Sequence, residues 1–445
     1  MKKNILLIVS SFIFASAGAQ VWDGTSAAWT DGSGSQQDPY IISAPQHLAY
    51  LNEQVDAGET YAGKYFKLAN DLDMGYSEGQ KFDPIGFFDE YQDPENQGQI
   101  IDNSKYFLGV FDGNYKTIDN IHIYFVDELN SVGGTGLFAC INGDAVVKNL
   151  TIGERSIFEG LDATGSIVGA MKSGSILNCM NKADLKNEPS ITAQAYNWMQ
   201  GGIVGFVNKG MVSGCVNEGY IKGNTVVGGV VGQIDGEVVV ENCYNIGEVW
   251  TKGLNGGGII GEIISGTLYN CYNSGKVFIT DDYWPDYYKA VVASVPYNTS
   301  VYKIENCYYL TLPDGATDEN TGVTAKTEDE MKGADFLAAL DNGQGVWVAD
   351  DKGINNGYPI LKWQADVASS INNVAAAQTG EITVDGHYVS TTDGGQCRIV
   401  VTSLGGSIVA EGTADGSGVY VAGNGIYVAT VYKDGAKYSA KVVIR

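Results

Sequence analysis

Short runs of β-branched residues, cut by glycine and asparagine, alternate with polar residues along the middle of the chain. The segment Glu-Val-Val-Val-Glu at residues 237–241 is followed by Gly-Glu-Val-Trp at residues 247–250. This period of two, interrupted by turn residues, predicts short β-strands. The stretches between glycines are too short for pairs of helices, so the pattern predicts an all-β chain.

Two segments depart from this pattern and read as helices. Residues 44–57 place Leu48, Leu51 and Val55 on one helical face, and Ser43 is positioned to cap the first turn. We expect this helix to cover the first strands of the β-structure, whose edge would otherwise be open to other chains.

The second predicted helix lies in residues 327–340. Its apolar residues are Met331, Phe336 and Leu340. Their spacing indicates a short helix near the far end of the β-structure.

One phrase recurs through residues 130–310. A Gly-Gly-Ile-Val-Gly-like segment leads to an Asn-Cys-Tyr-Asn-like segment in residues 201–217, 228–245 and 257–273, and more loosely in residues 165–181. The cysteines of the phrase are 28 residues apart in the two tightest steps and 36 where a longer segment intervenes. Each unit therefore holds several short strands. One unit cannot bury its own apolar face, but stacked units share a core, which predicts a parallel β-helix.

The cysteines and asparagines of the phrase occupy equivalent places in successive units. In a stack such places lie about 4.8 Å apart, so the cysteines should form an internal ladder. Parallel side chains fit disulfide geometry poorly, and we expect buried free thiols, although disulfides remain an alternative in an exported chain. The asparagines suit turns and hydrogen bonds along the stack better than contact with a ligand. The five cysteines of the series are Cys179, Cys215, Cys243, Cys271 and Cys307, with Cys140 and Cys397 outside it.

These phrases resemble the GLUG repeats of exported proteins from Bacteroidetes. The segment before them fits the opening of that family, with Asp-Pro-Tyr-Ile-Ile-Ser at residues 38–43 and Phe-Asp-Gly-Asn at residues 111–114. Gly-Tyr-Pro-Ile-Leu at residues 357–361 is similar to its usual close. The resemblance covers residues 22–363. It implies a right-handed parallel β-helix with an adhesive or scaffolding role, and it carries no catalytic residues.

The two ends of the chain predict export. Two lysines, an apolar run and small residues make residues 1–19 a secretory signal peptide, with cleavage expected between Ala19 and Gln20. The β-helix is then expected over residues 20–365 and a linker over residues 366–380. Residues 381–445 predict a small β-sandwich that resembles the type IX secretion sorting domains of Bacteroidetes, which implies contact with export machinery and secretion or retention at the cell surface.

Charge and motifs narrow the classes of function. With 27 basic and 52 acidic residues the formal charge is −25, which disfavours nucleic acid and anionic membranes as partners. The three histidines, His47, His122 and His387, fall in separate regions, and no zinc, phosphate-loop or nucleophile-elbow motif occurs in a suitable setting. We therefore expect neither a metal nor a cofactor.

Two longer segments interrupt the repeat and carry the candidate ligand-binding residues. Exposed aromatic side chains on loops of a rigid scaffold can stack on sugar rings or anchor a protein, although large apolar side chains are more often buried. The candidates are Tyr283, Trp284, Tyr287, Tyr288, Tyr196 and Trp198.

The sequence favours an adhesin-like protein that binds glycan or protein at a surface without transforming it. A β-helical polysaccharide lyase or glycosidase is the alternative, with Asp281, Asp282 and Asp286 as its candidate acids. A purely structural surface component is the third reading, and it needs no soluble ligand.

Overall fold

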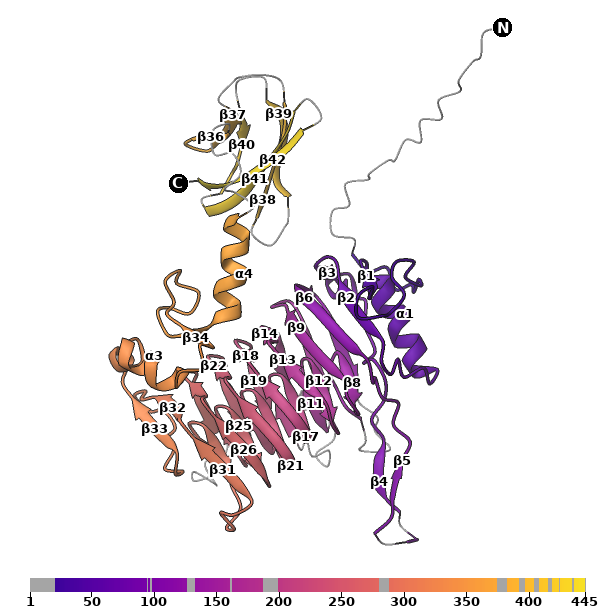
Figure 1. The fold of residues 1–445 in the computed structure, drawn as a ribbon, viewed down its shortest axis with the longest axis vertical. Helices are drawn as coiled ribbons and strands as arrows, with labels where there is room; N and C mark the ends of the chain where they lie inside the picture. Colours follow the sequence, from indigo (N-terminus) through magenta and orange to yellow (C-terminus); the bar gives the residue numbers. More distant parts are fainter. Residues whose placement is uncertain are drawn as a thin grey trace. The chain divides into compact units, whose positions relative to one another are not determined.

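A computed structural model describes residues 21–445 apart from 94, 97, 126–132, 161, 187–198, 280–287, 374–381, 392–396, 404–407, 415–417, 424, 434–435 and 445. The chain divides into two compact units, with a boundary between Ala368 and Ser369. The first unit is a stack of parallel strands and the second is a small antiparallel β-domain (Figure 1).

The first unit is a parallel β-helix, as the repeats predict. Each turn of the chain adds a strand to a large sheet and, in most turns, to two smaller sheets, and successive turns pair in parallel. The six-stranded sheet consists of β7 (His122–Phe125), β10 (Ile157–Gly160), β15 (Asp184–Lys186), β19 (Ile221–Gly223), β23 (Val249–Thr251) and β28 (Val277–Ile279). The five-stranded sheet consists of β11 (Ala163–Gly165), β16 (Met199–Gly201), β20 (Val226–Gly228), β24 (Gly256–Gly257) and β29 (Tyr288–Lys289). The twenty-stranded sheet consists of β1 (Tyr40–Ile42), β2 (Tyr65–Leu68), β3 (Leu72–Asp73), β6 (Val110–Asp119), β8 (Phe138–Ile141), β9 (Val146–Ile152), β12 (Val168–Met171), β13 (Ser175–Leu177), β14 (Met180–Asn181), β17 (Val204–Ser213), β18 (Val216–Asn217), β21 (Val231–Glu241), β22 (Tyr244–Asn245), β25 (Ile260–Ile263), β26 (Gly266–Tyr269), β27 (Tyr272–Asn273), β30 (Val292–Ser294), β31 (Tyr302–Glu305), β32 (Cys307–Leu310) and β33 (Val323–Lys326).

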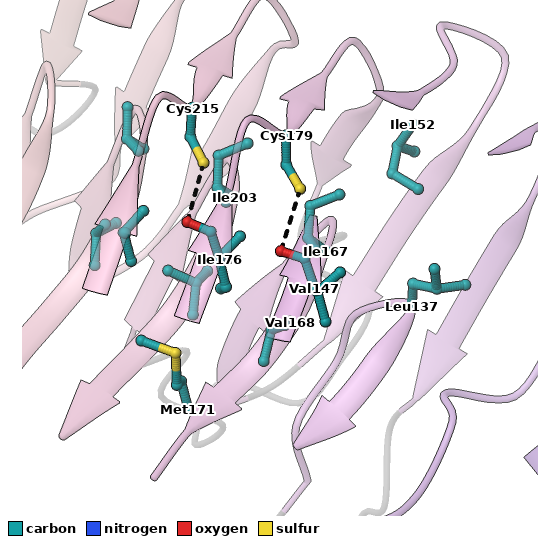
Figure 2. Packing of buried hydrophobic residues seen from close by; sticks show 14 of the residues in the cluster. Leu137, Val147, Ile152, Ile167, Val168, Met171, Ile176, Cys179, Ile203 and Cys215 are labelled. Carbon is teal, nitrogen blue, oxygen red and sulfur yellow. Dashed lines mark hydrogen bonds between the residues drawn. The ribbon is translucent and has the colours of Figure 1, made fainter. Parts of the chain in front are cut away.

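The predicted cysteine ladder lies inside the stack. All seven cysteines are buried and free of disulfides. The thiols of Cys179 and Cys215 point into the core toward the carbonyl oxygens of Val147 and Ile176, at 3.8 and 3.7 Å (Figure 2). The backbone N–H of Cys215 donates to the sulfur of Cys243 at 3.4 Å. The ladder is therefore a column of small apolar side chains, which confirms the prediction.

Each asparagine of the repeated phrase has a structural task. The asparagine before the cysteine turns the corner in the left-handed conformation, with φ of 54° at Asn178 and 51° at Asn242, and Gly214 takes the same place with φ of 68°. The asparagine after the cysteine is buried, and its side-chain amide donates to the next one along the stack, as Asn217 does to Asn245 at 2.7 Å. The structural interpretation of these residues is confirmed.

The second glycine of the Gly-Gly-Ile-Val-Gly phrase makes room for this buried amide. A Cβ atom at Gly229 would lie 2.5 Å from Cγ of Asn245 and 2.1 Å from the carbonyl oxygen of Gly258. The same relation joins Gly258 to Asn273, where the nearest amide atom would be 2.4 Å away. The two halves of the phrase thus pack against one another.

The first predicted helix forms as α1 (Pro45–Asp56), beside β1 and β2 at the amino-terminal end of the stack (Figure 1). Leu48 and Leu51 are fully buried and join the main core, which confirms the apolar face. The predicted cap is wrong. Ala44 is the N-cap and makes no side-chain bond, because Pro45 begins the helix and leaves Ser43 one residue too far back. The main chain between β3 and β6 also forms η1 (Tyr76–Glu78) and a hairpin of β4 (Glu90–Gln92) and β5 (Ile100–Asp102).

The second predicted helix forms as two, α2 (Glu328–Met331) and α3 (Ala334–Asp341), with a break at Gly333. They are followed by β34 (Trp347–Val348), β35 (Ile360–Leu361) and α4 (Lys362–Asn373). We call residues 327–364 the strap. The part of the expected linker from residue 366 to Asn373 is helical, and residues 374–381 lie outside the described residues.

The strap covers a column of side chains on the outside of the stack. The column comes from the residue after each ladder cysteine, and Tyr244 and Tyr272 stack in it with ring centroids 5.0 Å apart. Tyr272 donates from its hydroxyl to the Pro359 carbonyl oxygen at 2.7 Å, and Trp363 donates from Nε1 to the Gly214 carbonyl oxygen at 3.0 Å. The buried residues of this column are Met180, Val216, Tyr244, Tyr272 and Tyr308.

The second unit is the small β-sandwich expected at the carboxyl end. Both of its sheets are antiparallel, and their inner faces share one core that includes Val389, Ile399 and Val431. One sheet consists of β36 (Ile382–Asp385), β37 (Tyr388–Thr391) and β40 (Val419–Tyr420), and the other of β38 (Cys397–Ser403), β39 (Ile408–Ala414), β41 (Gly425–Lys433) and β42 (Ala436–Ile444).

Candidate functional site

Tyr288 is the one predicted ligand-binding residue that belongs to the described part of the chain. It begins β29, pairs with Gly256 of β24, and is half-buried against the main core. The other predicted binding residues, Tyr283, Trp284, Tyr287, Tyr196 and Trp198, lie outside the described residues, as do the candidate acids Asp281, Asp282 and Asp286.

The two interrupting segments are anchored at the same corner of the stack. Residues 187–198 connect β15 to β16, and residues 280–287 connect β28 to β29. In both cases the chain leaves the six-stranded sheet and enters the five-stranded sheet. The described residues on either side of both segments therefore lie where the chain passes from the six-stranded to the five-stranded sheet.

The outer surface of that six-stranded sheet carries several half-buried or exposed aromatic rings. Side chains alternate across a strand, so Val249 and Val277 point into the core while Trp250 and Phe278 point outward. The register pairs Trp250 with Phe278 on the next turn. We call the outward side chains of Tyr124, Tyr220, Trp250 and Phe278 the aromatic face.

Two rings of the aromatic face, Trp250 and Phe278, are direct neighbours on adjacent turns of the stack. Trp250 and Phe278 are stacked, with centroids 4.2 Å apart and planes inclined by 20°. Tyr220 follows with its centroid 6.5 Å from Trp250. Tyr124, on an earlier turn, is 43% exposed. Stacking fixes the orientation of Trp250 and Phe278, and each of these rings keeps part of its surface exposed.

Charged side chains of both signs are interspersed with these rings. The Lys81 ammonium lies 5.0 Å from the Tyr124 ring centroid, and the Lys276 ammonium lies 5.8 Å from that of Phe278. Trp250 donates from Nε1 to the Glu248 carboxylate at 3.2 Å. The sheet surface therefore offers aromatic rings, hydrogen-bond donors and acceptors without a strong excess of one charge.

The pKa values of two ionisable groups at this surface, Lys186 and Tyr220, are raised by their surroundings. The hydrogen bond from Lys186 to the Asp184 carboxylate, 2.7 Å long, raises the pKa of the lysine. Partial burial raises the pKa of the Tyr220 hydroxyl, with a further contribution from Glu248. Both groups keep their ordinary protonation state at neutral pH.

The three histidines do not come together. His47 belongs to α1 and His387 to the sandwich, while His122 on β7 is buried and forms a 2.7 Å contact with Glu159 on β10. In the described ranges, no group of three potential metal ligands is found.

Sequence reasoning missed the aromatic face, although a signal was present. Lys222, Trp250 and Phe278 hold the same position in consecutive repeats, each 28 residues from the next. Aligning the units shows that this outward position holds a lysine at Lys186 and Lys222 and becomes aromatic in the next two turns. The chain departs there from the polar residue expected at a solvent-facing strand position.

Comparison with known proteins gives one distant relationship. Part of the chain, 43% of its length, is 24% identical over 196 residues to halomucin from Haloquadratum walsbyi. This chain spans only about 2% of the length of that much larger protein. No family model matches the chain. No solved structure matches it either.

Within the described residues, helices long and apolar enough to cross a bilayer are absent.

Proposed function

We propose that this chain is an adhesin-like binding protein that acts outside the cytoplasm and holds a neutral polysaccharide along its aromatic face. The observation that carries the proposal is the stacked pair of Trp250 and Phe278, with the Tyr220 ring tilted beside it, on the outer surface of a rigid parallel sheet. Export rests on the signal peptide expected in residues 1–19, and the GLUG resemblance supports the same class of protein.

A repeating surface suits a repeating ligand. Neighbouring turns of the stack place equivalent side chains about 4.8 Å apart, so a linear polymer that runs along the stack can contact Trp250 and Phe278 in succession. The apolar face of a sugar ring packs on an aromatic ring, while its hydroxyls hydrogen-bond to flanking groups such as Glu248 and Lys222. Because the rings are held by the sheet before binding, little conformational entropy is lost on association.

Charge favours a neutral polymer over an acidic one. The whole chain carries a formal charge of −25, which repels polyanions at low salt. Lysines at the aromatic face are accompanied by acids, as Lys186 is by Asp184. The charges near the rings therefore provide hydrogen bonds without selecting a strongly charged ligand.

We further propose that the polysaccharide is bound without being cleaved, and that the β-sandwich serves export or retention at the surface. The sandwich is a separate unit with its own core, as a module with a separate task would be. The distant similarity to halomucin is compatible with a surface role and does not identify a ligand.

The test is electrophoresis of the mature chain through gels that contain laminarin, yeast mannan or xyloglucan, together with an assay for new reducing ends. We expect retarded migration in at least one gel, with no release of sugar. The double variant Trp250→Ala, Phe278→Ala should bind about 5- to 150-fold more weakly, since loss of two ring contacts costs about 1–3 kcal/mol.

The matched control is Tyr297→Ala, which removes a fully exposed ring elsewhere on the stack. It should migrate like the unmodified chain. Release of shortened sugars would instead favour the enzyme, and unchanged binding by the double variant would exclude the aromatic face.

A further inference from the structure

A polar groove lies on a different part of the stack, where the strap begins. Its volume is about 570 Å³, within the range of sites for small ligands. One wall is formed by β26, β31 and the corner residues Asn270 and Asn306, and the other by the turn after α3, including Gln344. The groove lies on the twenty-stranded sheet and shares no residue with the aromatic face.

Asn270 is only 1% exposed, and its amide nitrogen has no hydrogen-bond partner. At two other corners the asparagine donates to the asparagine on the preceding turn: Asn178 donates to Asn149 at 3.3 Å and Asn306 donates to Asn270 at 2.7 Å. Asn270 should in the same way donate to Asn242. A buried donor without a partner costs about 1–3 kcal/mol, so its occurrence needs a reason.

The strap interrupts the series at this step. Trp347 donates from Nε1 to the amide oxygen of Asn242 at 3.2 Å, and Asn242 in turn donates to the Gln344 side chain at 3.3 Å. The acceptor that would complete the series is thus engaged by the strap. Asn270, which lines the groove, is left with an unused donor.

The surrounding groups define the chemistry of a ligand. Lys303 and Glu305 pair with each other at 2.7 Å, so the wall carries no unbalanced charge. Tyr269 adds an aromatic ring, and Gln344 adds an exposed amide. Amides both donate and accept, and therefore match neighbouring hydroxyl groups that do the same.

We propose that this groove is a second binding site, which takes a single neutral sugar residue, and that on binding the buried Asn270 amide turns toward the groove so that Nδ2 donates to one of the sugar oxygens. The site is independent of the aromatic face: a single terminal or branching sugar fits a groove of this size, whereas a long chain suits the extended surface of the sheet. The sugar oxygen then supplies the hydrogen-bond acceptor that Nδ2 of Asn270 lacks in the unliganded chain.

The experiment is saturation-transfer difference NMR on the full mature chain with methyl β-galactoside, methyl α-mannoside and methyl β-glucoside as separate probes. The variant Asn270→Gly removes the amide but keeps the backbone, because Gly214 already occupies the equivalent corner with φ of 68°. Asn178→Gly is the matched control, since it makes the same change at a corner that does not line the groove. Gln344→Ala tests the opposite wall.

At least one glycoside should bind to the unmodified chain, to Asn178→Gly and to the double variant of the aromatic face. Binding should be at least ~10-fold weaker in Asn270→Gly, as for loss of a buried hydrogen bond, and weaker in Gln344→Ala. Absence of signal from all three probes, or equal binding by Asn270→Gly and Asn178→Gly, would overturn the site. Because Asn270→Gly should still bind polysaccharide in the gel, failure of this site is distinguishable from failure of the aromatic face.

Discussion

The buried asparagine ladder should contribute more to stability than any surface interaction of the stack. Asn245 is fully buried at its centre. Its amide donates to the Asn273 side chain at 2.8 Å and to the Gly247 carbonyl oxygen at 2.9 Å, and its oxygen accepts from Asn217 at 2.7 Å. The variant Asn245→Ala removes all three hydrogen bonds at once.

The expected cost follows from these contacts. Three hydrogen bonds at about 1 kcal/mol each give about 3 kcal/mol, and the buried groups left without a full set of partners add about 1–2 kcal/mol more. Stacked repeats transmit such a loss mainly to adjacent turns. We therefore expect the free energy of unfolding of the β-helix to fall by about 3–5 kcal/mol.

The assay is urea unfolding followed by far-ultraviolet circular dichroism, with the midpoint and slope fitted separately because a repeat protein need not unfold in one step. The control is Asn298→Ala, which alters an exposed loop asparagine whose side chain accepts only from the nearby Ser300, and it should change stability by about 1 kcal/mol or less. If Asn245→Ala unfolded within that same margin of the unmodified chain, the ladder would not be a source of stability and our account of the repeated phrase would be refuted.

Two further changes test the packing and the charge of the stack. Gly229→Ala should cost at least about 1–3 kcal/mol, because its Cβ would overlap Asn245 and Gly258, whereas Gly253→Ala, with open space around it, should be neutral by the same urea assay. Burial raises the pKa of Asp162 to about 6, so the folded chain holds this proton more tightly than the unfolded chain, and the stability that the proton supplies is lost as the pH rises from about 4 to 6. Asp162→Asn should raise the free energy of unfolding at pH 7 by about 1–3 kcal/mol and flatten that part of the pH profile, and thermal melts between pH 4 and 7 that parallel those of the unmodified chain would contradict this.

The repeated phrase was sufficient to predict the stack because its residues are fixed by contacts between equivalent positions. Cysteine, asparagine and glycine at constant spacing meet their own counterparts on the next turn, and each residue type has a local reason to stand there. The ladder of Cys215 and Cys243 and the corners at Asn178 and Asn242 follow from that spacing alone.

The strap could not be predicted, since its contacts join residues far apart in sequence. Trp363 meets Gly214 across 149 positions, and no period in the chain connects them. The tyrosine of the Asn-Cys-Tyr-Asn phrase gave a partial signal, because an outward aromatic residue repeated at Tyr244, Tyr272 and Tyr308 needs a cover.

The aromatic face escaped prediction for a different reason. The interrupting segments are rich in aromatic residues, and the candidate site was therefore predicted in loops. The rings on the sheet are a whole repeat apart in the sequence, so they do not form a visible cluster there. Register brings Trp250 beside Phe278, and only the paired strands show it. The prediction that Ser43 caps the first helix was also wrong, because the proline after Ala44 fixes where the helix begins.

The most direct test of the central claim is hydroxyl-radical footprinting of the mature chain with and without the polysaccharide that retards it, read by mass spectrometry at single residues. The account predicts that oxidation of Trp250 and Phe278 falls on binding while oxidation of the exposed Tyr297 is unchanged. Unaltered oxidation of Trp250 and Phe278 under saturating polysaccharide would contradict it.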